Sequence, residues 1–319
     1  MPEDFGIPFP HRCSPDLPAA RTHTIRWLRS HGLLRDELAE KRFTAMALAE
    51  VSAYAYPDAT GAELDVVTDA VSWIAICDDL LDELDVRDPE ALHRAWAFQQ
   101  QCFASLDAWL AGRPAPGATP LDDLLSRLGT GMTQTWRDRF ADGLRRWFWS
   151  SVDAAFLRPA NAVLSLHTYR VLCRETNGNR FFFPLTERAG GFEAPAALFG
   201  HPHFEAVHAA ADELVAFVQA VHSMDVEEAR GDHHNLVLVL EHQLRCSRAE
   251  ATTAALAEIT AAKDRFLHLT ASLPQVYDQL DFTPAPRAAA ERYVDGMRDI
   301  IAAARDYGTE SSRYQVVGR

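Results

Sequence analysis

Three aspartates at positions 78, 79 and 82 are the residues of this chain best placed to do chemistry. Asp78 and Asp82 are four residues apart, so on a helix they lie one turn apart on one face, with Asp79 beside them. The apolar stripe before them continues onto Asp78, which predicts that the acids face a cavity rim. Acids at the carboxyl end of a helix are unfavourable without a nearby cation, and Mg²⁺ commonly joins one or two carboxylates to substrate phosphates. The alternative interpretation is a solvated acidic helix end.

A second set of oxygen ligands repeats every four residues further along the chain. Gln219, Ser223 and Glu227 would place an amide, a hydroxyl and a carboxylate along one helix face. All three groups can bind Mg²⁺. The adjacent His233 and His234 would point to different faces of a helix and have no cysteine or HxxxH partner, so the pattern does not favour zinc.

A helix break follows a third chemical group, the guanidinium of Arg174. Asn177 and Gly178 tolerate positive φ and predict that a helix ends there, which would leave carbonyls free to stabilise positive charge. Arg174, one turn earlier, could bind a phosphate through bidentate hydrogen bonds from its guanidinium. A plain loop between two surface helices is the alternative. Near the end of the chain, Arg313 and Tyr314 could swing over an anionic site on a flexible tail.

The composition restricts the class of protein that carries these groups. The net charge of −14 argues against a nucleic-acid binder, which would show a basic stripe. No apolar run reaches the roughly 18 residues of a membrane span, and the early acids and prolines do not resemble a signal peptide. Five cysteines without CxxC spacing are typical of reduced thiols, so we expect a cytoplasmic protein without a membrane partner.

Helical periodicity runs through nearly every long segment that must position these groups. We therefore expect an all-α protein of about ten helices in one domain, residues 1–319, with an N-terminal segment at 1–18 and a C-terminal closing segment at 308–319. Pro and Gly pairs punctuate the segments, and 112–120 is too short to separate domains. The predicted helices are 19–34, 63–84, 89–110, 121–156, 164–176, 204–230, 248–272 and 286–307.

Taken in order, these four elements resemble the bacterial class I terpene cyclases. The order is an aspartate-rich DDxxD, an arginine before a helix break, an NDxxSxxxE-type metal motif and a C-terminal Arg-Tyr pair. The resemblance covers almost the whole chain and is closest to sesquiterpene cyclases of the pentalenene synthase kind. It implies an α-helical bundle around a central apolar cavity. It also implies a Mg²⁺-dependent lyase that ionises an isoprenyl diphosphate, cyclises the carbocation and releases diphosphate.

The resemblance assigns the metal ligands residue by residue. Asp78 would bind Mg²⁺ with support from Asp79 and Asp82, while Ser223 and Glu227 match the second metal motif and Gln219 takes its first position. Three Mg²⁺ ions are expected. By the same resemblance, the diphosphate would be met by Arg174, Arg230, Arg313 and Tyr314. Gly178 matches the helix-break glycine whose carbonyl faces the allylic carbon, and Asn177 takes the linker position before it.

A carbocation requires a dry apolar pocket, because any nearby water would capture it. Aromatic rings are suited to such a pocket, since each offers roughly 0.5–2 kcal/mol of cation–π attraction. Trp73, Phe181 and Tyr307 are the candidates for this lining. The alternative for each is an ordinary place in the core, because aromatic residues at helical spacing usually just pack.

The chain departs from the family's pattern mainly in the second metal motif. The usual Asn-Asp is Gln219-Ala220, the frequent lysine before the glutamate is Val226, and Asn177 stands where Asp is common. The leading hypothesis is a cyclase that uses farnesyl diphosphate. A diterpene cyclase that uses geranylgeranyl diphosphate is the alternative, because Ala75 and Cys77 could leave a deeper pocket. A degenerate protein that binds diphosphate without turnover is the third hypothesis, and the family resemblance allows a homodimer.

Overall fold

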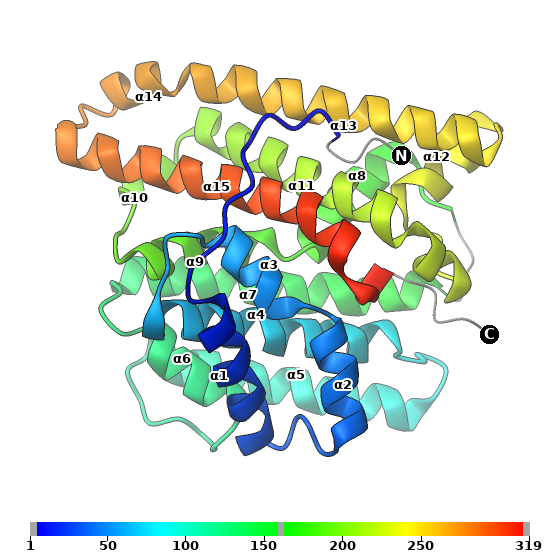
Figure 1. The fold of residues 1–319 in the computed structure, drawn as a ribbon, viewed down its shortest axis with the longest axis horizontal. Helices are drawn as coiled ribbons and strands as arrows, with labels where there is room; N and C mark the ends of the chain where they lie inside the picture. Colours follow the sequence, from blue (N-terminus) through cyan, green and yellow to red (C-terminus); the bar gives the residue numbers. More distant parts are fainter. Residues whose placement is uncertain (1–4, 159–162, 315–319) are drawn as a thin grey trace.

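The computed structural model of the 319-residue chain describes residues 5–158 and 163–314. Within these residues the chain forms α-helices and no strand, as the sequence predicts (Figure 1). The helices are α1 Leu17–Ser30, α2 Glu37–Ala45, α3 Leu48–Ala55, α4 Gly61–Asp82, α5 Pro89–Leu110, α6 Pro120–Leu128, α7 Gln134–Leu157, α8 Leu166–Thr176, α9 Asn179–Gly190, α10 Ala196–Phe199, α11 Pro202–Ala229, α12 Leu236–Leu244, α13 Arg248–Ala271, α14 Leu273–Gln279 and α15 Pro284–Glu310, with a 3₁₀ turn at Ser312–Tyr314.

Two long helices, α4 and α11, carry the two predicted metal motifs and are buried along most of their length. A helix that is apolar on nearly all sides belongs inside a bundle rather than on its surface. Helix α4 packs against α1, α3, α7 and α9, while α11 packs against α8, α12, α13 and α15. The two helices are therefore held by different sets of neighbouring helices, and one hydrophobic core joins all of them.

The number of helices differs from the sequence-based prediction. The described residues form fifteen α-helices rather than about ten. Part of the difference comes from short helices that the prediction did not include, such as α2, α3 and α12, which have eight or nine residues each. The prediction of a single helix over 121–156 was wrong. Helix α6 ends at its C-cap, Gly129, and the chain passes through Gly131 at φ +76°. Helix α7 then begins after its N-cap, Thr133, whose side chain accepts a hydrogen bond from the N–H of Trp136.

The N-terminal segment crosses α15 before the first helix begins (Figure 1). Phe5, Ile7 and Phe9 are buried, and the guanidinium of Arg305 on α15 donates hydrogen bonds to the carbonyls of Ile7 and Phe9 at 3.1 and 2.8 Å. This segment is thus part of the bundle's wall. Among the described residues, no helix has the length and apolar character needed to cross a membrane.

Candidate active site

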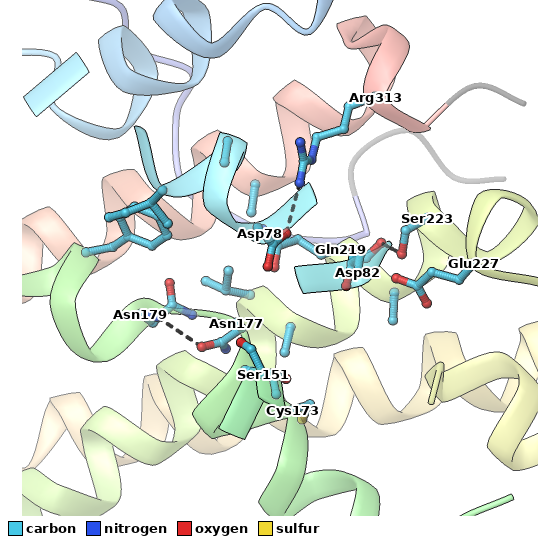
Figure 2. Close-up of a pocket in the computed structure, with 18 of the residues that line it drawn as sticks. Asp78, Asp82, Ser151, Cys173, Asn177, Asn179, Gln219, Ser223, Glu227 and Arg313 are labelled. Atoms are coloured by element: carbon cyan, nitrogen blue, oxygen red, sulfur yellow. Dashed lines mark hydrogen bonds and ion pairs between the residues drawn. The ribbon is translucent and has the colours of Figure 1, made fainter. Parts of the chain in front are cut away.

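A cavity of about 320 Å³ lies between α3, α4, α7, α8, α9, α11 and α15. At the polar end of the cavity, side chains from the carboxyl ends of α4 and α11 lie together with side chains from the C-terminal turn (Figure 2). Its other walls are mostly apolar and include Val71, Ile74 and Ile300. The chain thus builds a pocket with a charged end and an apolar interior.

The aspartate cluster lines the charged end of this cavity, as the helical spacing predicts. Arg313 reaches it from the C-terminal turn (Figure 2), with its Nη2 at 2.9 Å from an Asp78 oxygen and its Nη1 at 3.0 Å from an Asp79 oxygen. Burial, together with the nearby charge of Asp82, raises the pKa of Asp78 to about 7 despite Arg313. An additional cation at this end would favour the ionised carboxylates.

The second motif also faces the cavity, since Gln219, Ser223 and Glu227 all line it. The Ser223 hydroxyl donates a hydrogen bond to the Gln219 carbonyl at 2.9 Å, as helical serines often do. Burial raises the pKa of Glu227 to about 7. The side-chain amide of Asn235, which the sequence analysis missed, donates to Glu227 Oε2 at 2.8 Å. Its position before the apolar run of α12 signals a helix cap, but nothing in the sequence signals its contact with Glu227.

A second missed residue, Arg158, joins the two sides of the charged end. Its guanidinium contacts Asp82 at 2.7 Å and Asp232 at 2.8 Å, and it donates hydrogen bonds to the carbonyls of Leu81 and Asp82. Arg230, predicted to meet the diphosphate, lies 3.5 Å from Asp82. Arg158 stands at the end of α7 and belongs to no recognisable sequence motif. Only the packing of α7 beside α4 shows that it lies at the charged end of the cavity.

The break between α8 and α9 has the backbone that the sequence predicts. Gly178 adopts φ +78°, and a Cβ there would lie 2.6 Å from the ring of Phe181. Asn177 lines the cavity, and its Oδ1 accepts a hydrogen bond from the Asn179 N–H at 3.0 Å. The Gly178 carbonyl accepts hydrogen bonds from the N–H groups of the first turn of α9. A small residue with free φ is therefore required at 178.

Arg174 does not reach the cavity in this structure. Its Nε donates to the carbonyl of Arg170 at 3.0 Å, and its Nη1 lies 3.7 Å from Glu213 on α11. The residue is absent from the cavity's described lining. Its role as a diphosphate contact stays a prediction that requires the side chain to turn by one or more rotamers.

Of the three aromatic residues predicted to line the pocket, Tyr307 does so, and the predictions for Trp73 and Phe181 are wrong in this structure. Both of these rings are buried behind the wall, where other rings surround them. Trp147 and Phe182 provide aromatic lining instead. The rings of Tyr307 and Tyr314 meet edge to face at 5.7 Å beside the charged end.

The donor set at the charged end fits a hard divalent cation. Partly buried carboxylates and a hydroxyl face one cavity, and oxygen ligands are those that Mg²⁺ prefers. Within residues 5–158 and 163–314, no three His, Cys, Asp or Glu side chains converge tightly enough to enclose a metal ion alone. The arrangement therefore suits an ion held between one or two carboxylates and a bound phosphate group rather than in an all-protein cage.

An all-α bundle whose central cavity carries an aspartate-rich motif opposite an S-x-x-x-E motif is the architecture of the class I terpene synthases. The family described as "Terpene synthase family 2, C-terminal metal binding" matches residues 69–265, and the chain belongs to this family. The protein is accordingly a terpene synthase, a lyase that acts on a diphosphate, and its family is one of metal-binding proteins.

Known relatives align over nearly the whole chain. Pentalenene synthase of Streptomyces exfoliatus is 34% identical over 98% of this chain and 94% of its own, and R-linalool synthase of Streptomyces clavuligerus is 31% identical over 98% and 93%. Among solved structures, α-eudesmol synthase superposes with a TM-score of 0.84 at 26% identity over 95% of this chain and 97% of its own. The linalool/nerolidol synthase of Streptomyces clavuligerus, in complex with 2-fluorogeranyl diphosphate, gives 0.81 at 27% over 97% and 99%. The expected family and fold are confirmed.

Proposed function

We propose that the protein is a Mg²⁺-dependent sesquiterpene cyclase that ionises farnesyl diphosphate and cyclises the resulting carbocation. The observation that carries this proposal is a cavity that has both oxygen-ligand motifs at one end and apolar walls at the other. A diphosphate fits the charged end because metal ions and arginines there can balance its charge. A prenyl chain fits the apolar interior.

Some residues of the charged end would bind metal ions, and others would bind the phosphate groups. Asp78, Ser223 and Glu227 would hold Mg²⁺, with Asp79, Asp82 and Gln219 supporting, and three ions are part of the proposal. Bound Mg²⁺ supplies Lewis-acid stabilisation of the leaving diphosphate. Arg313, Arg230 and Tyr314 would donate hydrogen bonds to phosphate oxygens, which requires Arg313 to exchange its carboxylate partners for phosphate.

The apolar walls would then protect the cation. Trp147, Phe182 and Tyr307 line the cavity, and a ring face turned toward a passing cation would stabilise it. The choice of a C15 chain is supported by relatives, one of which is named 7-epi-alpha-eudesmol synthase ((2E,6E)-farnesyl diphosphate cyclizing) and is 28% identical over 322 aligned residues. A cytoplasmic location and a homodimer stay predictions from the sequence.

The test is incubation of the purified protein with farnesyl, geranyl and geranylgeranyl diphosphates, with Mg²⁺ or with EDTA, followed by mass spectrometry of the organic extract. We expect a cyclic C15 product that requires Mg²⁺ and that disappears in Asp78→Asn. Asp85→Asn is the matched control, because Asp85 lies just beyond the helix and pairs with Arg87 outside the cavity. Turnover that survives EDTA would overturn the metal mechanism, and turnover of the C20 substrate alone would replace the assigned substrate.

A folded protein without turnover would favour the degenerate alternative. In that case Gln219→Asn, which shortens the side chain by one methylene and restores the family's usual residue, should create activity. Full activity of the unmodified protein would show that Gln219 is a competent ligand position despite its added length.

A further inference from the structure

A second cavity, of about 310 Å³, adjoins the apolar interior of the first. It is lined by the N-terminal segment, the residues that follow α3, and parts of α9 and α15. Among the described residues, Ala55 and Tyr56 alone line both cavities. These two residues at the end of α3 therefore form the partition between the two spaces.

The two cavities follow one another along the same helices. On α15, residues 300–307 contribute to the first cavity and residues 292–299 to the second. On α9, Asn179 and Phe182 line the first, and Thr186 lines the second one turn further on. Tyr307 and Asn179 lie in the parts of α15 and α9 that are nearer the metal motifs. The second cavity therefore lies beyond the end of the first cavity that is farther from the aspartates.

Tyr56 is held firmly in this partition. Its side chain is almost fully buried, at 4% exposure, and its hydroxyl donates a hydrogen bond to the Phe182 carbonyl at 3.0 Å. This bond ties the end of α3 to the first turn of α9. Ala55 beside it has too small a side chain to close the opening alone, so the phenol ring supplies most of the barrier.

The rim of the second cavity is accessible to water. Its rim carries Arg12, which pairs with Asp58 at 2.5 Å and with Asp299 at 2.9 Å, and the Asp58 side chain is 79% exposed. Exposed ion pairs of this kind are hydrated. On the other side of Tyr56, the first cavity presents Val71 and Ile300. The phenol ring thus stands between a water-accessible space and an apolar one.

We propose that Tyr56 is a specificity-determining residue that keeps the water of the second cavity away from the carbocation in the first. This inference rests on the proposed cyclase function. If water enters, a lone pair of its oxygen forms a C–O bond to the cationic carbon, and one proton leaves to solvent or to the released diphosphate. The product is then an alcohol, and no oxidant or reductant takes part.

The experiment uses farnesyl diphosphate and Mg²⁺ in ¹⁸O-labelled water with wild type, Tyr56→Ala, Tyr56→Leu and Tyr56→Phe. Mass spectrometry measures the share of ¹⁸O-labelled products other than the main wild-type product. We expect a several-fold rise in this share for Tyr56→Ala and a smaller rise for Tyr56→Leu. We expect none for Tyr56→Phe, which keeps the ring and loses only the bond to Phe182.

A matched control removes a ring of the same size from another wall. Tyr169 on α8 is buried and lines the first cavity but not the second, so Tyr169→Ala enlarges the first cavity without joining the two. We expect no comparable rise in labelled products. An equal rise in Tyr169→Ala would attribute the effect to cavity size and overturn the assignment of Tyr56 as a barrier.

The remaining outcomes also separate the hypotheses. An active wild type with no new labelled product in Tyr56→Ala or Tyr56→Leu overturns this inference alone. Loss of all turnover in both variants, with melting curves that show folded protein, would mean that Tyr56 is needed for binding or ionisation instead. A wild type without turnover removes the proposed function and this inference with it. Tyr56→Leu retains apolar bulk, so it covers the case in which Tyr56→Ala does not fold.

Discussion

Asn235 offers a test of how the second metal motif is held in place. Its side chain is fully buried and makes three hydrogen bonds at once. The Nδ2 group donates to Glu227 Oε2 at 2.8 Å and to the Ala220 carbonyl at 2.7 Å, while Oδ1 accepts from the Val237 N–H at 2.9 Å. The last bond caps α12, and the first two fix α11 and its glutamate.

Two substitutions separate these roles because both retain a good helix cap. Asn235→Ser and Asn235→Asp each keep a side-chain oxygen that can accept from the Val237 N–H, and each removes the amide donor. A hydrogen bond to a charged group contributes about 1.5–3 kcal/mol and one to a neutral carbonyl about 0.5–1.5 kcal/mol. The expected loss is therefore roughly 2–4.5 kcal/mol, or roughly 3–7 °C in melting temperature for a chain of this size.

The two variants should differ in their dependence on pH. Near pH 8, Asn235→Asp places a second carboxylate against Glu227 and should melt at least as early as Asn235→Ser. Burial already raises the pKa of Glu227 to about 7, so at lower pH one proton can be shared between the two acids and restore a hydrogen bond. The Asn235→Asp defect should therefore shrink strongly between about pH 8 and pH 5.5. The Asn235→Ser defect should shrink less, because it brings no second carboxylate to Glu227.

The assay is thermal unfolding followed by circular dichroism, with each variant compared with wild type at both pH values. Melting within about 1 °C of wild type for both variants at both pH values would show that Asn235 only caps α12. Equal pH dependence of the two variants would refute the proton-sharing argument while leaving the donor role intact.

Three further perturbations test other parts of the structure by thermal unfolding. Gly178→Ala puts a Cβ at φ +78° and 2.6 Å from a buried phenylalanine ring, so it should cost about 2–4 kcal/mol, whereas Gly200→Ala, with its nearest neighbour at 3.9 Å, should cost far less. The pKa of His23 is raised, chiefly by its hydrogen bond to buried Asp69, so this pair stabilises the fold below about pH 6.5 and loses that contribution as pH rises through the raised pKa. His23→Gln should remove this fall in stability between pH 6 and 8, and an unchanged pH profile would contradict the linkage. Arg158→Met removes the nearest charge partner of two partly buried carboxylates, Asp82 and Asp232, and should cost about 1–3 kcal/mol, with a larger stabilisation by added Mg²⁺ than in wild type. Equal Mg²⁺ responses would argue against a shared charge site.

The sequence alone determined the helical class and the positions of the chemical groups along the chain. The four-residue spacing of Asp78 and Asp82, and of Ser223 and Glu227, is a property of helix geometry that holds in any context. The break at Gly178 followed equally from local backbone preferences. These features are local, so no knowledge of neighbouring helices was needed to predict them.

Tertiary structure decided which buried side chains face the cavity and which groups support the motifs. Helical periodicity shows that a residue such as Trp73 or Phe181 is buried, but a ring packed among other rings and a ring facing a cavity have the same pattern. Arg158 and Asn235 meet Asp82 and Glu227 only because α7 and α12 pack beside α4 and α11. The partition at Tyr56 likewise depends on where α3 ends against α9, a relation between segments more than 120 positions apart.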